Sequence, residues 1–309
     1  MKLIQWIMRY KLFALMAFMT FTIVVSCQQK AKYFDRQDAA VEIPYKMDST
    51  VYPFPWLNFY EVKNTIINRI GCPDGFSRIP TAKNSFGHWL QRLPLKSGHP
   101  KVKLYDGSDK GNQQAQAYVV DLDVGEKDLQ QCADALIRLR SEYLLATGKT
   151  DSIHFKYTNG ATVTYNKWSK GYMPVPKSGG KVSWVTSSKA GTGYDKFKKF
   201  LIQVYNYAGT HSLEKELTSV PFKDMKPGDI LIRGGFPGHG IMVVDMAINK
   251  TTGEKMFMLA QSFMPAQEVH ILRNPMNDAL SPWYSMKDIK FDIETPEWWF
   301  DTGNLKRWN

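Results

Sequence analysis

The stretch from Met225 to Asp245 constrains the fold most strongly, because its pattern predicts a strand, a glycine-rich loop and a second strand. Pro227-Gly228 is typical of a turn, and a short apolar run follows at 230–232. A second apolar run, 241–244, begins two residues after His239. A side chain at the start of a buried strand is held by the sheet yet stays near a surface. His239 is therefore a candidate general base, since position matters before pKa.

Periodicity and turn signals predict the other elements. We expect helices over 59–70, 85–93, 128–146, 194–207 and 213–217, and strands over 102–105, 117–122, 256–260 and 269–272. An Asn159-Gly160 turn predicts a hairpin over 154–165, and residues 166–193 are expected to form a long surface loop. This order favours an α+β fold, with N-terminal helices packed on a mostly antiparallel sheet.

The N-terminus has the pattern of a secretory signal, with basic residues ahead of an apolar run over 12–25. The run ends in Val24-Val25-Ser26-Cys27, which resembles the bacterial lipobox and implies cleavage before Cys27 and acylation of that residue. An uncleaved anchor or an incidental cysteine is the alternative. We therefore expect a signal peptide over 1–27, a tether over 28–55 and a single domain over 56–309. The lipid would hold the protein to a membrane of the bacterial cell envelope, on the periplasmic face or at the outer membrane.

The formal charge of +11 is spread along the chain without a run of five basic residues, which argues against nucleic acid as a partner. Anionic headgroups or carboxylate-bearing cell-wall peptides are the expected neighbours. Neither a metal site nor a cofactor is expected, because HxH, HExxH and paired CxxC patterns do not occur in the sequence. Trp168 and Trp184 are candidates for the walls of a groove; alternatively, they form a satellite cluster under the loop.

Cys132 is expected in the first turn of the helix over 128–146, with Asp128 as its N-cap and Gln131 completing a capping box. Unpaired N–H groups and the helix dipole favour a thiolate at that position. Two alternatives remain. A buried cysteine is often inert packing, and a disulfide between Cys72 and Cys132 would be permitted beyond the inner membrane.

A third polar group should orient the imidazole. A strand over 256–261 that runs back beside 240–247 would bring Gln261 near His239, although sequence does not fix the register. Asp245 lies on the same strand as His239 but roughly 20 Å along it, which makes it a poor partner. Gln267 is a weaker alternative to Gln261.

A cysteine at a helix start, a Pro-Gly-Asp strand at 227–231 and a Gly-His strand at 238–242 together resemble the NlpC/P60 branch of papain-like peptidases, over a core of about 126–275. Over nearly its full length the chain also resembles uncharacterised lipoproteins of Bacteroides-type bacteria. The segments that carry this second resemblance are 131–140, 234–239 and 259–267.

The peptidase resemblance implies that Cys132 is the nucleophile, His239 the base and Gln261 its orienter. The oxyanion would meet the Cys132 backbone N–H, with Gln131 as a further candidate. The implied activity is that of a cysteine peptidase or amidase on peptidoglycan stem peptides or a related amide, or of an acyltransferase. The alternative is a non-catalytic envelope lipoprotein that binds glycan or peptide on the same fold.

Overall fold

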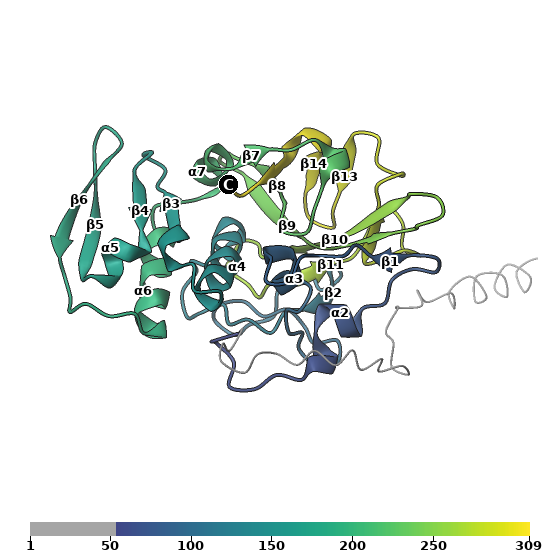
Figure 1. The fold of residues 1–309 in the computed structure, drawn as a ribbon, viewed down its shortest axis with the longest axis horizontal. Coiled ribbons are helices and arrows are strands. Elements are labelled where there is room, and N and C mark those ends of the chain that lie inside the picture. Colours follow the sequence, from purple (N-terminus) through teal and green to yellow (C-terminus); the bar gives the residue numbers. More distant parts are fainter. Residues whose placement is uncertain (1–53) are drawn as a thin grey trace, which may run out of the picture. The chain divides into compact units, whose positions relative to one another are not determined.

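The computed structural model describes residues 54–309, which form an α+β fold around a nine-stranded sheet (Figure 1). The main path is β2-β11-β10-β9-β8-β15-β7, while β1 pairs with β9 and β12 pairs with β10. The strands are β1 Ser77–Arg78, β2 Gln116–Val119, β7 Thr218–Ser219, β8 Ile230–Arg233, β9 His239–Ile248, β10 Lys255–Gln261, β11 His270–Leu272, β12 Trp283–Ser285 and β15 Leu305–Arg307. All of these pairings are antiparallel, as expected.

The helices lie largely to one side of this sheet. They are α2 Ile66–Arg69, α3 Phe86–Leu90, α4 Cys132–Ala146, α5 Tyr165–Ser169, α6 Tyr194–Tyr205 and α7 Thr210–Glu216. The longest, α4, lies between the sheet and the α5–α6 region (Figure 1) and packs against β9 and β10. It is buried on almost all sides, so even Arg138 and Glu142 are enclosed, where they form an ion pair of 2.6 Å.

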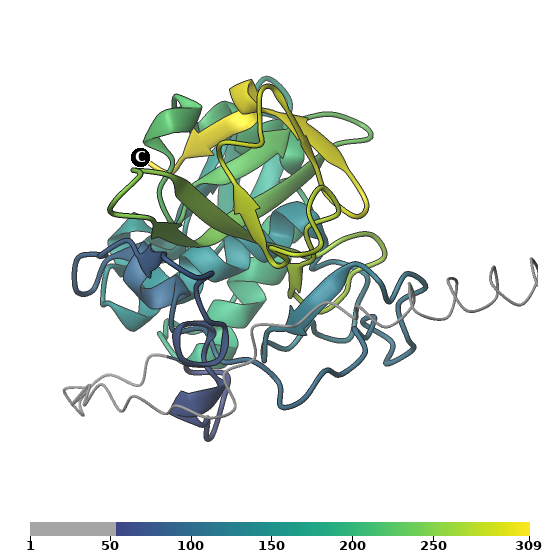
Figure 2. The same cartoon turned by 90° about the vertical axis from the view of Figure 1, so that its right-hand side faces the viewer.

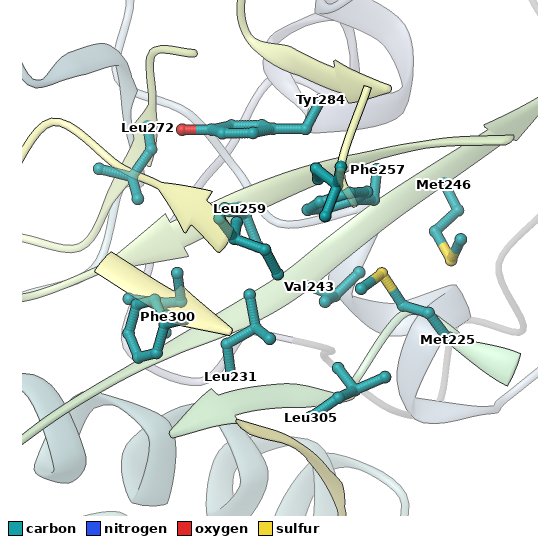
Figure 3. Close-up of a cluster of buried hydrophobic side chains, with 13 residues drawn as sticks. Met225, Leu231, Val243, Met246, Phe257, Leu259, Leu272, Tyr284, Phe300 and Leu305 are labelled. Carbon is teal, nitrogen blue, oxygen red and sulfur yellow. The ribbon is translucent and has the colours of Figure 1, made fainter. Parts of the chain in front are cut away.

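The other face of the sheet carries a hydrophobic core. Alternate residues of β9, including Ile241 and Val243, meet side chains of β8, β10 and the C-terminal segment (Figure 3). That segment adds β13 Asp292–Glu294, β14 Trp299–Asp301 and β15, drawn in yellow in Figure 2. Phe300 and Leu305 bring it into the core, so the tail is an integral part of the fold.

Gly240 sits where α4 crosses β9. A Cβ atom there would lie 2.9 Å from Leu136 Cδ1 and 3.4 Å from Ile232 Cγ1. We expect Gly240→Ala to lower the free energy of unfolding by about 1–3 kcal/mol, because it overpacks the helix–sheet contact. Urea unfolding checks this, with Gly111→Ala as the control because a Cβ atom there meets nothing within 4 Å and the residue lies outside the helices and strands. An equal loss in the two variants would contradict the close contact.

Four expectations were wrong. The 166–193 segment is not a loop: it contains α5 and the hairpin β5 Tyr172–Lys177 with β6 Lys181–Thr186. Gly179 and Gly180, both at positive φ, permit its tight turn. The expected 59–70 helix is reduced to the 3₁₀ turn Val62–Asn64 and α2. Residues 102–105 make only isolated bridges, and the helix expected from 128 begins at Cys132.

The other expected elements are present with small boundary shifts, among them the hairpin β3 His154–Lys156 and β4 Thr162–Thr164. Residues 1–53, which include the expected signal peptide, Cys27 and most of the expected tether, lie outside the described residues. Phe54, at the end of that expected tether, is buried beside Trp56, Tyr60 and Trp89. Within 54–309, none of the helices is both long and apolar enough to span a membrane.

Candidate active site

Cys132 is the first residue of α4, and its side chain is 6% exposed. The thiol lies against the backbone N–H groups of Ala133 and Gly240, which favour its ionised form. Burial outweighs them and, together with the nearby Asp134 carboxyl, raises the pKa of the Cys132 thiol to about 11. In this closed arrangement the sulfur is therefore a neutral thiol at pH 7.

The helix starts at Cys132 because the side chain of Asp128 binds groups outside the helix instead of capping it. The Asp128 carboxylate accepts from the Ala266 backbone N–H at 2.7 Å and from Gln131 Nε2 at 2.9 Å. Gln131 is thus the N-cap, and its own N–H donates to Asp134 at 3.2 Å. The predicted cap at Asp128 is therefore wrong: α4 begins three residues later than that cap implies, with Gln131 as N-cap and Asp134 accepting from its backbone N–H. Gln131, the further oxyanion candidate, has its backbone N–H and side-chain amide engaged in this cap.

Cys72 and Cys132 are both free thiols. The alternative of a disulfide between them is therefore wrong. Cys132 is buried, whereas Cys72 is partly exposed after α2.

His239 opens β9, and its Nε2 lies 2.9 Å from Gln261 Oε1 at the end of β10. The register that places them pairs Ala260 with Met242, so Gln261 and His239 fall on the same face of neighbouring strands. Three rings surround the imidazole, at centroid distances of 4.7 Å for Phe263, 5.4 Å for Trp298 and 5.9 Å for Phe300. His239 is completely shielded from solvent.

The Gln261 amide has only one workable orientation. Its Nε2 lies 2.8 Å from Glu297 Oε2, and an ionised carboxylate can only accept hydrogen bonds. The amide nitrogen must therefore face Glu297, and the carbonyl oxygen must face His239. It follows that His239 Nε2 carries the proton and donates it, which leaves the Nδ1 lone pair unprotonated.

His270 completes the assignment. Its Nδ1 lies 2.9 Å from the Glu268 carbonyl oxygen, which only accepts, so Nδ1 carries the proton. Its Nε2 then accepts from the second hydrogen of the Gln261 amide, 3.4 Å away. Each polar atom of the Gln261 side chain thus has a partner, and the two histidines hold opposite tautomers.

Both imidazoles are neutral over the physiological range. Burial lowers the pKa of His239 to about 4, opposed by its hydrogen bond to Gln261. Burial lowers the pKa of His270 to about 3, and the charge of Lys110 acts in the same direction. His239 can therefore accept a proton at Nδ1 at any pH well above 4.

The sequence does not predict the residues that hold Gln261 in place beside His239. Glu297 is held by Lys110 at 2.5 Å, and the Lys110 side chain is 5% exposed. These residues lie far apart in the chain and belong to no motif, so no sequence signal joins them. His270 could have been found, because it pairs with Gln261 across β10 and β11, two strands that the sequence predicts.

Other predicted residues lie elsewhere. Asp245 accepts from Arg78 and Gln91, each at 2.7 Å, and takes no part in the site. Gln267 donates to Pro265, so Gln261 is the glutamine on His239. Trp168 packs against Phe200 of α6 and donates to the Lys196 carbonyl, whereas Trp184 lines a separate cavity.

The arrangement joins Gln261 to His239 but does not bring the thiol and the imidazole together. His239 lies on the face of β9 that carries Ile241 and packs against Phe300, whereas Cys132 lies on the opposite face, which α4 covers. His239 Nδ1 is buried and has no hydrogen-bond partner among residues 54–309. The thiol instead meets the N–H of Gly240, the next residue along β9. Within the same residues, no group of three or more His, Cys, Asp or Glu side chains could hold a metal ion.

Comparison with known proteins gives one assignment. Neither the curated proteins nor the solved structures include a match to this chain. A family model described as a domain of unknown function (4846), DUF4846, matches residues 66–307. The matched region includes Cys132, His239 and Gln261, together with Glu297 and all nine strands of the main sheet. The chain belongs to the DUF4846 family.

Proposed function

We propose that this protein is a cysteine hydrolase that cleaves an amide by a papain-like, NlpC/P60-type mechanism. The observation that carries the proposal is the His239–Gln261 bond at 2.9 Å, whose polarity leaves the lone pair of His239 Nδ1 without a hydrogen-bond partner. A base in a fixed tautomer and a thiol at a helix N-terminus are the parts of a thiol–imidazole nucleophile. The two groups start on opposite faces of β9, with His239 beside Phe300 and Cys132 on the face that α4 covers, so the imidazole must turn around the end of the strand to reach the thiol.

In the proposed reaction, His239 Nδ1 takes the thiol proton as Cys132 sulfur attacks the amide carbonyl carbon. The tetrahedral oxyanion is stabilised by backbone N–H groups at the start of α4, where helices leave such donors unpaired. The C–N bond then breaks, and the imidazolium returns its proton to the leaving amine. Water, deprotonated by His239, attacks the thioester and releases the acid and the free thiol. Transfer to a second amine would give an acyltransferase instead.

The site must open for this chemistry. Phe263 and Trp298 shield His239, and their displacement by substrate would expose Nδ1. Phe263 lies in the loop that begins with Ser262, whose hydroxyl contacts the Gln130 carbonyl oxygen just before α4. The Ser262 hydroxyl also donates to the Gln267 carbonyl oxygen at 2.8 Å, so the loop that shields His239 only touches the segment that carries Cys132.

The proposed substrates are stem peptides of peptidoglycan or related amides. The support is the lipobox-like sequence at Cys27, which would place the domain in the cell envelope, together with a net positive charge that suits carboxylate-bearing peptides.

The deciding experiment is product analysis by mass spectrometry on purified muropeptides. We expect wild type to release free amines and to show a thioester mass on the Cys132 peptide. Cys132→Ser should reduce turnover by at least about 10³-fold, in line with the loss of a catalytic nucleophile. Cys72→Ser is the matched control and should retain activity. Equal turnover in wild type and Cys132→Ser would refute the proposal.

A second candidate is a binding protein on the same fold without chemistry. Complete burial of His239 and the raised pKa of the Cys132 thiol favour it, because a working thiol nucleophile usually has a lowered pKa. It predicts muropeptide binding without products, and identical affinity for wild type and Cys132→Ala.

A further inference from the structure

The β5–β6 hairpin and α5 line an open depression of about 440 Å³, and these elements lie on the side of the molecule away from β10 (Figure 1). Its lining is Thr164, Asn166, Lys167, Lys170, Tyr172 and Trp184. None of these residues belongs to α4, β9 or β10, so the cavity is distinct from the candidate active site. Its volume lies within the range of about 300–1,000 Å³ that is usual for small-ligand pockets.

The two aromatic rings share one face of the hairpin. Tyr172 pairs with Thr186, and Trp184 pairs with Pro174, which makes Tyr172 and Trp184 diagonal neighbours. Tyr172 is 40% exposed, so part of its ring remains open to a ligand. Flat apolar surfaces of this kind suit the C–H face of a sugar ring.

Two lysines face the same space without a counter-charge. Lys167 Nζ lies 4.8 Å from the centroid of the Trp184 ring and 5.9 Å from that of Tyr172. Among residues 54–309, neither Lys167 nor Lys170 forms an ion pair. Ammonium groups placed beside aromatic rings can bind a carboxylate while the ligand's ring covers the aromatic surface.

Local charge supports an anionic ligand. Residues 165–199 contain eight lysines and one aspartate, a net charge of +7, within a chain whose total is +11. The segment has no run of five basic residues, yet it carries most of the net charge of the chain. Helix α5, which carries Lys167, is held against α6, because Trp168 of α5 donates to the Lys196 carbonyl oxygen at 2.9 Å.

The rim offers hydroxyl partners. Asn166 donates to Asp151, which leaves its carbonyl oxygen free to accept, and the Thr164 hydroxyl accepts from the Lys167 N–H and can still donate. A concave site with such donors and acceptors fits a saccharide better than a membrane surface, which would favour protruding apolar side chains.

We propose that this cavity binds an acidic saccharide, with the sugar ring on Tyr172 and Trp184 and the carboxylate at Lys167 and Lys170. The site would hold a glycan, and it does not depend on chemistry at Cys132. A hydrolase of peptidoglycan would gain a second binding site for its polymer. A binding protein without chemistry would use the same site.

Isothermal titration of the full chain tests this, with a galacturonic acid trimer as the acidic probe and a galactose trimer as the neutral one. We expect the acidic trimer to bind at least about tenfold more tightly, as charge-assisted hydrogen bonds allow. Lys167→Gln with Lys170→Gln should remove that preference. Trp184→Ala should weaken the binding of both trimers.

Lys177→Gln with Lys181→Gln is the matched control, because it removes two charges from the hairpin outside the cavity. It should keep the preference for the acidic trimer. Equal loss of the preference in the control pair and in Lys167→Gln with Lys170→Gln would show diffuse charge attraction and overturn the proposal. So would equal affinity for the two trimers. The lysine variants change exposed residues, so the test does not depend on the folding of Trp184→Ala.

Discussion

Acidification from pH 7 to pH 4 is expected to lower the free energy of unfolding by roughly 3 kcal/mol for each of His239 and His270. Burial lowers the pKa of these residues to about 4 and about 3, against 6.5 for an ordinary histidine. Between those values the unfolded chain binds more protons than the folded one. The stabilisation is therefore complete above pH 6.5 and is lost as the pH falls toward 4 for His239 and 3 for His270.

Urea unfolding followed by tryptophan fluorescence at several pH values measures this loss. His270→Gln should flatten the decline by about half, because one of the two titrating groups is removed. His154→Gln is the control: its pKa is raised by the hydrogen bond to Glu216, so its protonation does not oppose folding in acid. A decline of the same steepness in wild type and His270→Gln would show that buried carboxyl groups dominate acid unfolding.

The strand–loop–strand at 225–245 could be recognised because buried strands leave strong local patterns. Pro227-Gly228, the apolar run of β8 and the run after His239 all reflect backbone needs that neighbouring residues meet. The partner of His239 could also be inferred, since an antiparallel return of β10 brings Gln261 to the same end of the sheet. Local pattern and simple topology were sufficient for these features.

Long-range contacts explain what sequence reasoning missed. The start of α4 depends on the bond from the Ala266 N–H to Asp128, and the periodicity of the helix contains no trace of that bond. Glu297 and Lys110 meet only after the C-terminal segment has folded over the sheet. Composition predicts a loop over 166–193 because glycine, serine and lysine are common there, and glycine and lysine are depleted in strands. The hairpin forms through the cross-strand pairing of β5 with β6.

Glu297→Gln is expected to let His239 carry its proton on either ring nitrogen instead of on Nε2 alone. A carboxylate can only accept, whereas a glutamine amide can present oxygen or nitrogen to Gln261. Only the long contact of 3.4 Å to His270 Nε2 would then oppose a turn of the Gln261 amide. His239 would then populate both tautomers, and the Nδ1 lone pair would be lost in a fraction of molecules. If the proposed hydrolysis is correct, turnover should fall about 10–100-fold, a loss typical of residues that orient a functional group.

Nitrogen-15 NMR measures the tautomers without an activity assay. In wild type at pH 7 we expect a proton on Nε2 of His239 and on Nδ1 of His270, and in Glu297→Gln a mixture at His239. The variant also leaves Lys110 buried without its partner, which costs stability. Lys110→Met combined with Glu297→Gln removes that cost but keeps the amide free to turn. If the double variant regains stability and shows a single His239 tautomer, Glu297 acts only through stability. If the double variant is stable but the tautomer mixture persists, Glu297 positions His239 through Gln261.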